Sequence, residues 1–381
     1  MNFYEKMGLK PIVNASETYT ALGGSLMDPG ALKAMKDAAS GFIDLDKLID
    51  AVCRKASELT KNDAAFVTTG AAGGVVLTAA ACICGDDPAG MDMLPSTEGF
   101  ERNEVLVYDG GFQQLIPYWK LIKLTGARII SVPPSLDAIA EAVNERTAAF
   151  FLFPAPLYEK GIPTCEETIP VLKKLGVPVI VDAAAQLPPV SNLWYYTKEL
   201  GADAAVFSGG KHIRGPQSTG LIVGRPDIIN TCRLLASPNC RLGRAFKTGK
   251  EELAGFITAL EIFVGEPEEG RFDRQLKMLL DIEKRLSANK DTGLKILREG
   301  RLGTCQPLLL VTLPKGKTAK ECNNFTRNYK VPVDVGVYPP EFEMPEDVIF
   351  VNAYNLQERE PDIVADAIMD YINDTDHINE K

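Results

Sequence analysis

A lysine behind two glycines is the first group in this chain that could do chemistry. Residues 207–220 read FSGGKHIRGPQSTG and place Lys211 behind Ser-Gly-Gly at the end of an apolar run. A second segment, VPVIVDAAAQLPP over residues 177–189, ends another apolar run on Asp182. A third, VTTGAAGG over residues 67–74, leads an apolar run into small residues. An amine, a carboxylate and open backbone N–H groups are therefore available for one site.

The spacing of the lysine and the carboxylate brings them together. Lys211 follows Asp182 by 29 residues, the length of one strand–helix–strand crossover. Parallel strands that are neighbours in a sheet end at the same edge, where open α/β sheets bind their ligands. Small residues at a helix start leave N–H groups that can hold an anion. We therefore expect Lys211, Asp182 and a helix start near residue 70 to face one ligand.

Each of these features also has an ordinary explanation. A glycine-rich turn can pack a strand against a helix, an aspartate after a strand can be a helix N-cap, and most lysines are solvated. Their joint occurrence favours a cofactor instead. Pyridoxal 5′-phosphate needs a lysine for its aldehyde, a carboxylate for its pyridine nitrogen and donors for its phosphate. The sequence thus predicts this cofactor, with a Schiff base on Lys211, Asp182 at the ring nitrogen, and glycines that let the backbone approach it.

Strands and helices alternate through the middle of the chain, as in EVLVYDG, LIPYWKLIKLTG, ARIISVP and SLDAIAEAVN. The apolar runs show little alternation, as expected for strands covered by helices on both faces. We predict an α/β fold around a mainly parallel sheet. An N-terminal arm without a long periodic element is expected over residues 1–44, and a large domain over 45–250. Residues 251–381 change to long helices and further strands, which indicates a smaller α+β domain.

Composition disfavours several classes of function. A net charge of −10 and a pI near 5.0 argue against a nucleic-acid partner. The N-terminus lacks a signal-peptide pattern, and the longest apolar run, residues 71–84, is too short to cross a membrane. With only His212 and His377, neither a histidine-rich metal site nor a Ser-His-Asp triad is expected. Eight scattered cysteines fit reduced thiols in a cytoplasmic protein.

The lysine and aspartate segments also resemble a known family. VDAAAQLPP followed by FSGGKHIRGPQSTGLIVG is similar to the fold-type-I pyridoxal-phosphate enzymes related to bacterial selenocysteine synthase. YEKMGLKPIVNASETYTALGGSLM and GRAFKTGKEELAGFITALE resemble the D-glucosaminate-6-phosphate ammonia-lyase branch, so the resemblance covers residues 4–265. It implies the fold-type-I architecture with a seven-stranded type of sheet, and assembly into a homodimer or a larger homo-oligomer.

The resemblance implies roles at matching positions. Lys211 would carry the cofactor, and Asp182 would pair with the pyridine nitrogen. In related enzymes an aromatic ring stacks on the pyridine, and the matching position here is Phe112. The cofactor phosphate would be bound by small residues at two strand ends: Ser208, Gly70, Ala71 and Ala72.

Two positions depart from the pattern of this branch where the substrate is expected. Glu17 stands in NASETYT, where relatives read Ala-Ser-Gly-Thr. Asp109 stands in YDGGFQQ, where a basic residue and a histidine are expected. Thr18, beside the first departure, is predicted to bind the substrate. These departures leave the identity of the substrate open.

A cluster of cations follows the sheet region of this acidic protein, in GRAFKTGKEE over residues 243–252. A solvated first turn of the next helix would explain the cluster. Arginine and lysine beside a glycine also suit a phosphate or a carboxylate. We expect Arg244, Lys247 and Lys250 to bind the anionic end of the substrate, or the cofactor phosphate, across a dimer interface.

These features together predict a pyridoxal-phosphate-dependent ammonia-lyase. It would remove water and ammonia from a 2-amino-3-hydroxy acid or an amino sugar acid resembling D-glucosaminate 6-phosphate, to give a 2-keto-3-deoxy acid. The expected partner is a small anionic substrate, without nucleic acid, membrane or metal. A racemase or an aldolase would use the same carbanion chemistry. A selenocysteine-synthase-like transferase acting on aminoacyl-tRNA is a further alternative, against which the acidic pI counts.

Overall fold

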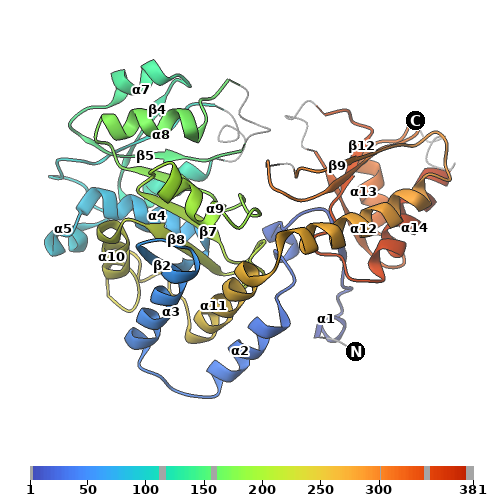
Figure 1. The fold of residues 1–381 in the computed structure, drawn as a ribbon, viewed down its shortest axis with the longest axis horizontal. Coiled ribbons are helices and arrows are strands. Elements are labelled where there is room, and N and C mark those ends of the chain that lie inside the picture. Colours follow the sequence, from blue (N-terminus) through green and yellow to red (C-terminus); the bar gives the residue numbers. More distant parts are fainter. Residues whose placement is uncertain (1–2, 111–116, 156–160, 301, 339–343, 375–381) are drawn as a thin grey trace. The chain divides into compact units, whose positions relative to one another are not determined.

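The computed structural model describes residues 3–110, 117–155, 161–300, 302–338 and 344–374. The chain forms two compact units (Figure 1). The larger unit is Ser25–Gly265, and the smaller unit combines Met1–Gly24 with Glu266–Lys381. Each unit has an apolar core of its own.

A seven-stranded sheet forms the centre of the larger unit, in the order β2-β8-β7-β6-β5-β3-β4. Neighbouring strands are parallel except at β8, which runs antiparallel to β2 and β7. The mainly parallel α/β sheet is therefore confirmed. Its strands are β2 (Ala64–Thr69), β3 (Glu104–Tyr108), β4 (Arg128–Val132), β5 (Thr147–Leu152), β6 (Val179–Asp182), β7 (Ala204–Ser208) and β8 (Thr219–Gly224).

Apolar side chains run through these strands almost without interruption, because helices cover the sheet. β3, β5 and β8 are buried at every position. Helix α4 is buried along most of its length and packs against β2, β7 and β8. The helices of this unit are α2 (Pro29–Ala39), α3 (Leu45–Leu59), α4 (Gly70–Cys84), α5 (Pro88–Met93), η2 (Tyr118–Thr125), α7 (Leu136–Ala142), α8 (Cys165–Lys174), α9 (Asn192–Trp194), η4 (Tyr195–Glu199), α10 (Pro226–Leu235) and α11 (Lys250–Gly265).

Two elements of the larger unit differ from the sequence-based expectation. Helix α2 occupies part of the stretch expected to be an arm without a long periodic element. The Asp28 side chain caps it by accepting from the Gly30 N–H at 2.8 Å, and Pro29 begins it. Only Ala31 of this helix is buried. Strand β8 was not expected either, since its sequence TGLIVG is a short apolar run bounded by glycine.

The smaller unit contains a five-stranded sheet in the order β1-β11-β12-β10-β9. The N-terminal strand β1 is parallel to β11, and the other pairs are antiparallel. Helices α12 and α14 pack against each other. The elements are α1 (Phe3–Lys6), β1 (Val13–Ala15), η1 (Thr20–Leu22), α12 (Glu268–Leu286), β9 (Gly293–Leu297), β10 (Leu308–Thr312), α13 (Ala319–Arg327), β11 (Val333–Val337), β12 (Val348–Val351) and α14 (Glu360–Asn373).

The boundaries between the two units follow Gly24 and Gly265, whereas the sequence placed boundaries at residues 44 and 250. Residues 1–24 belong to the smaller unit because β1 pairs with β11, more than 300 positions further along the chain. Helices α2 and α11 belong to the larger unit, where they pack together. Composition does not reveal such pairings between distant segments.

Candidate active site

Asp182, Ser208 and the start of α4 lie along one edge of the seven-stranded sheet. Asp182 ends β6 and Ser208 ends β7, and these strands are parallel neighbours. On the other side of β7, Ser208 pairs with Gly220 of β8. The adjacent residue of β8, Thr219, pairs with Thr69 at the end of β2, and α4 begins directly after Thr69. The strands that precede these residues are therefore arranged as the spacing predicted, while a common ligand stays a prediction.

The Asp182 carboxylate is half-buried at the end of β6. Its Oδ1 accepts a hydrogen bond from the Ala184 N–H at 3.1 Å. Burial raises the pKa of Asp182 to about 6, while this hydrogen bond and the positive charge of Lys211 act in the opposite direction. The chain after Asp182 forms a turn, and the next helix begins only at Asn192, so the helix N-cap explanation does not hold. A carboxylate placed this way is stabilised by a cation that reaches it.

Lys211 lies in the turn that follows β7, and Ser25 holds this turn. The Lys211 carbonyl accepts from the Arg214 N–H at 3.0 Å and from the Ser25 hydroxyl. Ser25 also donates to the Gly210 carbonyl, from its N–H at 3.0 Å and from its hydroxyl at 3.1 Å. Sequence reasoning missed Ser25, because a serine in ALGGSLM gives no sign of a contact 186 positions away.

The two glycines before Lys211 lie where a larger residue would collide with the chain, and their predicted role at the cofactor stays a prediction. A Cβ on Gly209 would lie 2.1 Å from Thr219 Oγ1 and 2.8 Å from the ring of Phe256. A Cβ on Gly210 would lie 2.4 Å from the Cα of Gln217. The packing of the chain against itself therefore requires both glycines, and approach to a cofactor is not needed to explain them.

Helix α4 begins with N–H groups that no side chain caps. Its N-cap residue, Thr69, makes no capping hydrogen bond, and the first turn holds no acidic residue. The positive end of the helix dipole is thus open to an anion. Gly70 differs from its predicted role, because its N–H donates to the Ser218 carbonyl at 2.6 Å and its φ is +64°. Gly70 turns the chain, which leaves the N–H groups of Ala71 and Ala72 as donors for a phosphate.

Residues 243–252 approach the start of α4 within the larger unit. Phe246 lies 3.8 Å from the Cβ position of Gly73, and Thr248 Oγ1 lies 3.3 Å from Thr69 Oγ1. Arg244 and Lys247 are exposed.

Lys250, the third cation of this segment, is already engaged. Its Nζ donates to the Ala38 carbonyl at 2.6 Å and pairs with Glu251 at 2.5 Å. This observation favours a structural role over the predicted contact with substrate.

The remaining predicted residues are Thr18, Asp109 and Phe112. Thr18 is buried in the smaller unit. The Asp109 side chain is exposed, and its N–H donates to the Val132 carbonyl at 2.8 Å. Phe112 lies outside the described residues.

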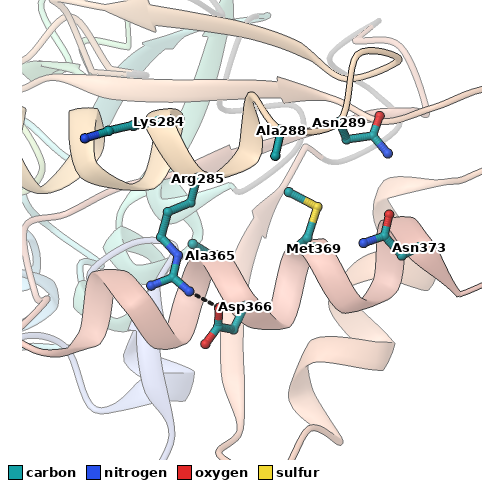
Figure 2. A pocket seen from close by; sticks show the side chains of 8 residues that line it. All are labelled: Lys284, Arg285, Ala288, Asn289, Ala365, Asp366, Met369 and Asn373. Carbon is teal, nitrogen blue, oxygen red and sulfur yellow. Dashed lines mark hydrogen bonds and ion pairs between the residues drawn. The ribbon is translucent and has the colours of Figure 1, made fainter.

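A hollow of about 450 Å³ lies in the smaller unit between α12 and α14 (Figure 2). Arg285 crosses it to pair with Asp366, and it also pairs with Asp362 at 2.6 Å. None of the predicted site residues line this hollow. Its lining residues are Lys284, Arg285, Ala288, Asn289, Ala365, Asp366, Met369 and Asn373.

Known proteins resemble this chain in sequence. No family model matches the chain. The chain is 31% identical to D-glucosaminate-6-phosphate ammonia lyase of Salmonella typhimurium over 265 residues, which cover 68% of this chain and 69% of the relative. It is 32% identical to 5′-C-glycyluridine monooxygenase-decarboxylase of a Streptomyces species over 313 residues, covering 77% of this chain and 76% of the relative.

The chain belongs to the fold-type-I pyridoxal-phosphate family that includes D-glucosaminate-6-phosphate ammonia lyase. The solved structure of that ammonia-lyase matches 98% of both chains with a TM-score of 0.82 at 24% identity. The protein is thus an enzyme of the ammonia-lyase family, and its cofactor is pyridoxal 5′-phosphate. Its own residues fit this group, because the half-buried Asp182 carboxylate and the uncapped N–H groups of α4 lie at one edge of the sheet, and Lys211 lies in the turn after β7 at the same edge.

Two further observations concern the residues that the structure describes. None of their helices is both long and apolar enough to span a bilayer. No three of their histidine, cysteine, aspartate or glutamate side chains gather as metal ligands would.

Proposed function

We propose that this enzyme is an ammonia lyase that removes ammonia, by dehydration and then hydrolysis, from a 2-amino-3-hydroxy acid, with an amino sugar acid resembling D-glucosaminate 6-phosphate as the favoured substrate. The product is a 2-keto-3-deoxy acid. The observation that carries the proposal is the half-buried Asp182 carboxylate, whose surroundings include the charge of Lys211. The relative that is 31% identical and is named for this activity supports it.

Each residue at this edge of the sheet would bind a different part of the cofactor. Lys211 Nζ would hold its aldehyde carbon, and Asp182 would keep a proton on its ring nitrogen. Ser208 and the N–H groups of Ala71 and Ala72 would bind its phosphate, where the α4 dipole favours an anion. When bound, the protonated ring withdraws electrons from the substrate Cα.

The Lys211 amine would carry the proton transfers. Its Nζ takes the proton from the substrate Cα and gives a proton to the β-hydroxyl, so that the C–O bond breaks and water leaves. Addition of one water then releases ammonia and leaves the keto group, so that the net loss from the substrate is ammonia alone. Asp182 supports this sequence by staying ionised next to a cation.

The anionic end of the substrate would meet Arg244 and Lys247. Both side chains are exposed, on a segment that reaches the start of α4. We place this contact across the interface of a homodimer or a larger homo-oligomer. A small anionic substrate and a cytoplasmic location complete the proposal.

Decarboxylation is a second candidate reaction. The relative from Streptomyces, named a monooxygenase-decarboxylase, is 32% identical over a longer stretch than the ammonia lyase. Both reactions begin by breaking a bond to the substrate Cα, and they differ in whether a proton or carbon dioxide leaves.

A substrate panel tests the proposed function. The purified holoenzyme is incubated with D-glucosaminate 6-phosphate, D-glucosaminate and the two enantiomers of serine, and ammonia, keto acid and carbon dioxide are followed. The proposal expects equal amounts of ammonia and keto acid from at least one of these, and none from the K211A variant. Carbon dioxide without ammonia would support the second candidate, and no product from any of them would contradict both the reaction and the substrate class.

A further inference from the structure

Arg214 holds a backbone conformation that residues with a side chain rarely adopt. It closes the turn after β7, three residues beyond Lys211, and its φ is +59°. In this left-handed region a Cβ crowds the following carbonyl oxygen, so glycine usually occupies such positions. Among the residues that the structure describes, Lys61 is the only other non-glycine residue with a positive φ, at +54°. Contacts made by Arg214 must therefore offset the strain.

The segment that leads into α2 supplies these contacts. Arg214 Nε donates to the Leu26 carbonyl at 2.9 Å, and the Arg214 carbonyl accepts from the Asp28 N–H at 3.0 Å. The Arg214 N–H donates to the Lys211 carbonyl at 3.0 Å. Ser25, in the same segment as Leu26, donates its hydroxyl to that Lys211 carbonyl as well. Arg214 thus connects the segment before α2 with the lysine that is predicted to hold the cofactor.

The base of this turn is closed by hydrogen bonds that do not involve Arg214. The Gly215 N–H donates to the Gly209 carbonyl at 2.8 Å, and the Gly209 N–H donates to the Thr219 carbonyl at 2.8 Å. Removing the Arg214 side chain would leave these bonds in place. The loss would therefore fall on the part of the turn that contains Lys211, and the fold around it would be kept.

We propose that Arg214 is a positioning residue for Lys211. Its guanidinium, bonded to the Leu26 carbonyl, holds the turn in the conformation from which the lysine amine reaches the cofactor. This inference rests on the proposed function, since it takes Lys211 as the residue that binds the cofactor. A glycine at position 214 would adopt the same φ more easily, but it has no side chain with which to bond to Leu26. That bond is what the strained arginine contributes.

Three substitutions separate this role from a general contribution to stability. R214G keeps the backbone conformation and removes the guanidinium, whereas R214K keeps a cation that can donate to the Leu26 carbonyl. K61G is the matched control, because Lys61 also combines a positive φ with a side-chain contact, its Nζ lying 3.7 Å from the centre of the Trp194 ring. Lys61 precedes β2, whereas the candidate site lies beyond the other end of that strand.

The measurement is the rate at which the cofactor becomes attached. Pyridoxal 5′-phosphate is added to each cofactor-free protein, and the growth of the visible band of the lysine-bound cofactor is followed by stopped-flow absorbance. R214G should form the band at least about tenfold more slowly than the wild type, because a displaced amine reaches the aldehyde less often. R214K should recover much of the rate, and K61G should match the wild type. Urea unfolding checks that each variant is folded, and if R214G is not, R214M should show the same slow attachment.

A wild-type rate in folded R214G and R214M, or an equal loss of rate in K61G, would overturn this inference alone. A visible band in K211A, or none in the wild type, would contradict the assignment of Lys211 and with it the proposed function. The two failures are thereby distinguished.

Discussion

The Asp182 carboxylate shows how burial can prepare a group for a ligand. Burial raises its pKa to about 6 from the ordinary 3.8. The folded protein therefore favours the protonated form, and the contribution of this group to stability is fully present below about pH 4 and is lost as the pH rises through about 6. A bound cofactor with a protonated ring nitrogen would supply the cation that the ionised group needs.

The first prediction concerns stability of the cofactor-free protein. The D182N substitution should raise the free energy of unfolding at pH 7.5, by on the order of 2–3 kcal/mol, because the ionised carboxylate no longer has to be buried. At pH 4 the two proteins should be equally stable. Urea unfolding at both pH values measures this. The same difference at both pH values would show that Asp182 is not the titrating group.

The second prediction concerns turnover at the same residue. D182A should lower kcat about a thousandfold, which corresponds to about 4 kcal/mol of transition-state stabilisation, because the ring would lose its proton. Circular dichroism and the visible spectrum check that the variant is folded and still binds the cofactor. Full activity in a folded D182A holoenzyme would show that Asp182 is not needed for turnover and only stabilises the turn through its hydrogen bond to Ala184.

At the scale of elements, most of the larger unit could be predicted from the sequence. Uninterrupted apolar runs gave the parallel strands, and the spacing from Asp182 to Lys211 correctly indicated neighbouring strands. Strand β8 was not predicted because glycines bound its short apolar run, and α2 because it falls in the glycine-rich stretch expected to be an arm. These elements depend on packing between distant segments, which a local pattern does not encode.

The candidate site was predictable to a similar extent. Residue type and position after a strand were enough to find Lys211, Asp182 and the start of α4, although their roles remain predictions. Ser25 could not be found this way, because its significance lies in contacts with distant residues. The side chain of Lys250 was expected at the substrate, yet it bonds to the end of α2.

The third prediction tests the turn that presents Lys211. In G210A the new Cβ would lie 2.4 Å from the Gln217 Cα, so the backbone must shift. We expect a loss of about 1–3 kcal/mol in the free energy of unfolding of the cofactor-free protein. G41A is the control, since nothing lies within 4 Å of its Cβ position. If G210A were as stable as G41A but bound the cofactor more weakly, Gly210 would be needed for cofactor binding and not for packing.

At the scale of the whole molecule, the fourth prediction concerns Arg244 and assembly. R244Q should raise KM for a phosphorylated substrate far more than for its unphosphorylated analogue, because arginine can bind two phosphate oxygens. R54Q serves as the control, since Arg54 is an exposed arginine of α3. An equal change in both KM values would show that Arg244 does not recognise the phosphate.

The interface part of that proposal has its own test. Co-refolding K211A with R244Q subunits should restore activity if Arg244 serves the site of a neighbouring subunit, because a mixed oligomer then contains one site with both residues intact. Neither variant alone should show this activity with limiting phosphorylated substrate. Failure of the mixture to recover would place Arg244 in the same subunit as the Lys211 that it assists, or outside the site.

The central claim is that Lys211 holds the cofactor, and borohydride reduction tests it most directly. The purified holoprotein should be yellow, and reduction should fix the cofactor to the chain as a stable secondary amine. Proteolysis and mass spectrometry should then find the added mass on the peptide containing Lys211, and K211A should carry no label. Label on any other lysine, or no chromophore after addition of pyridoxal 5′-phosphate, would contradict the account.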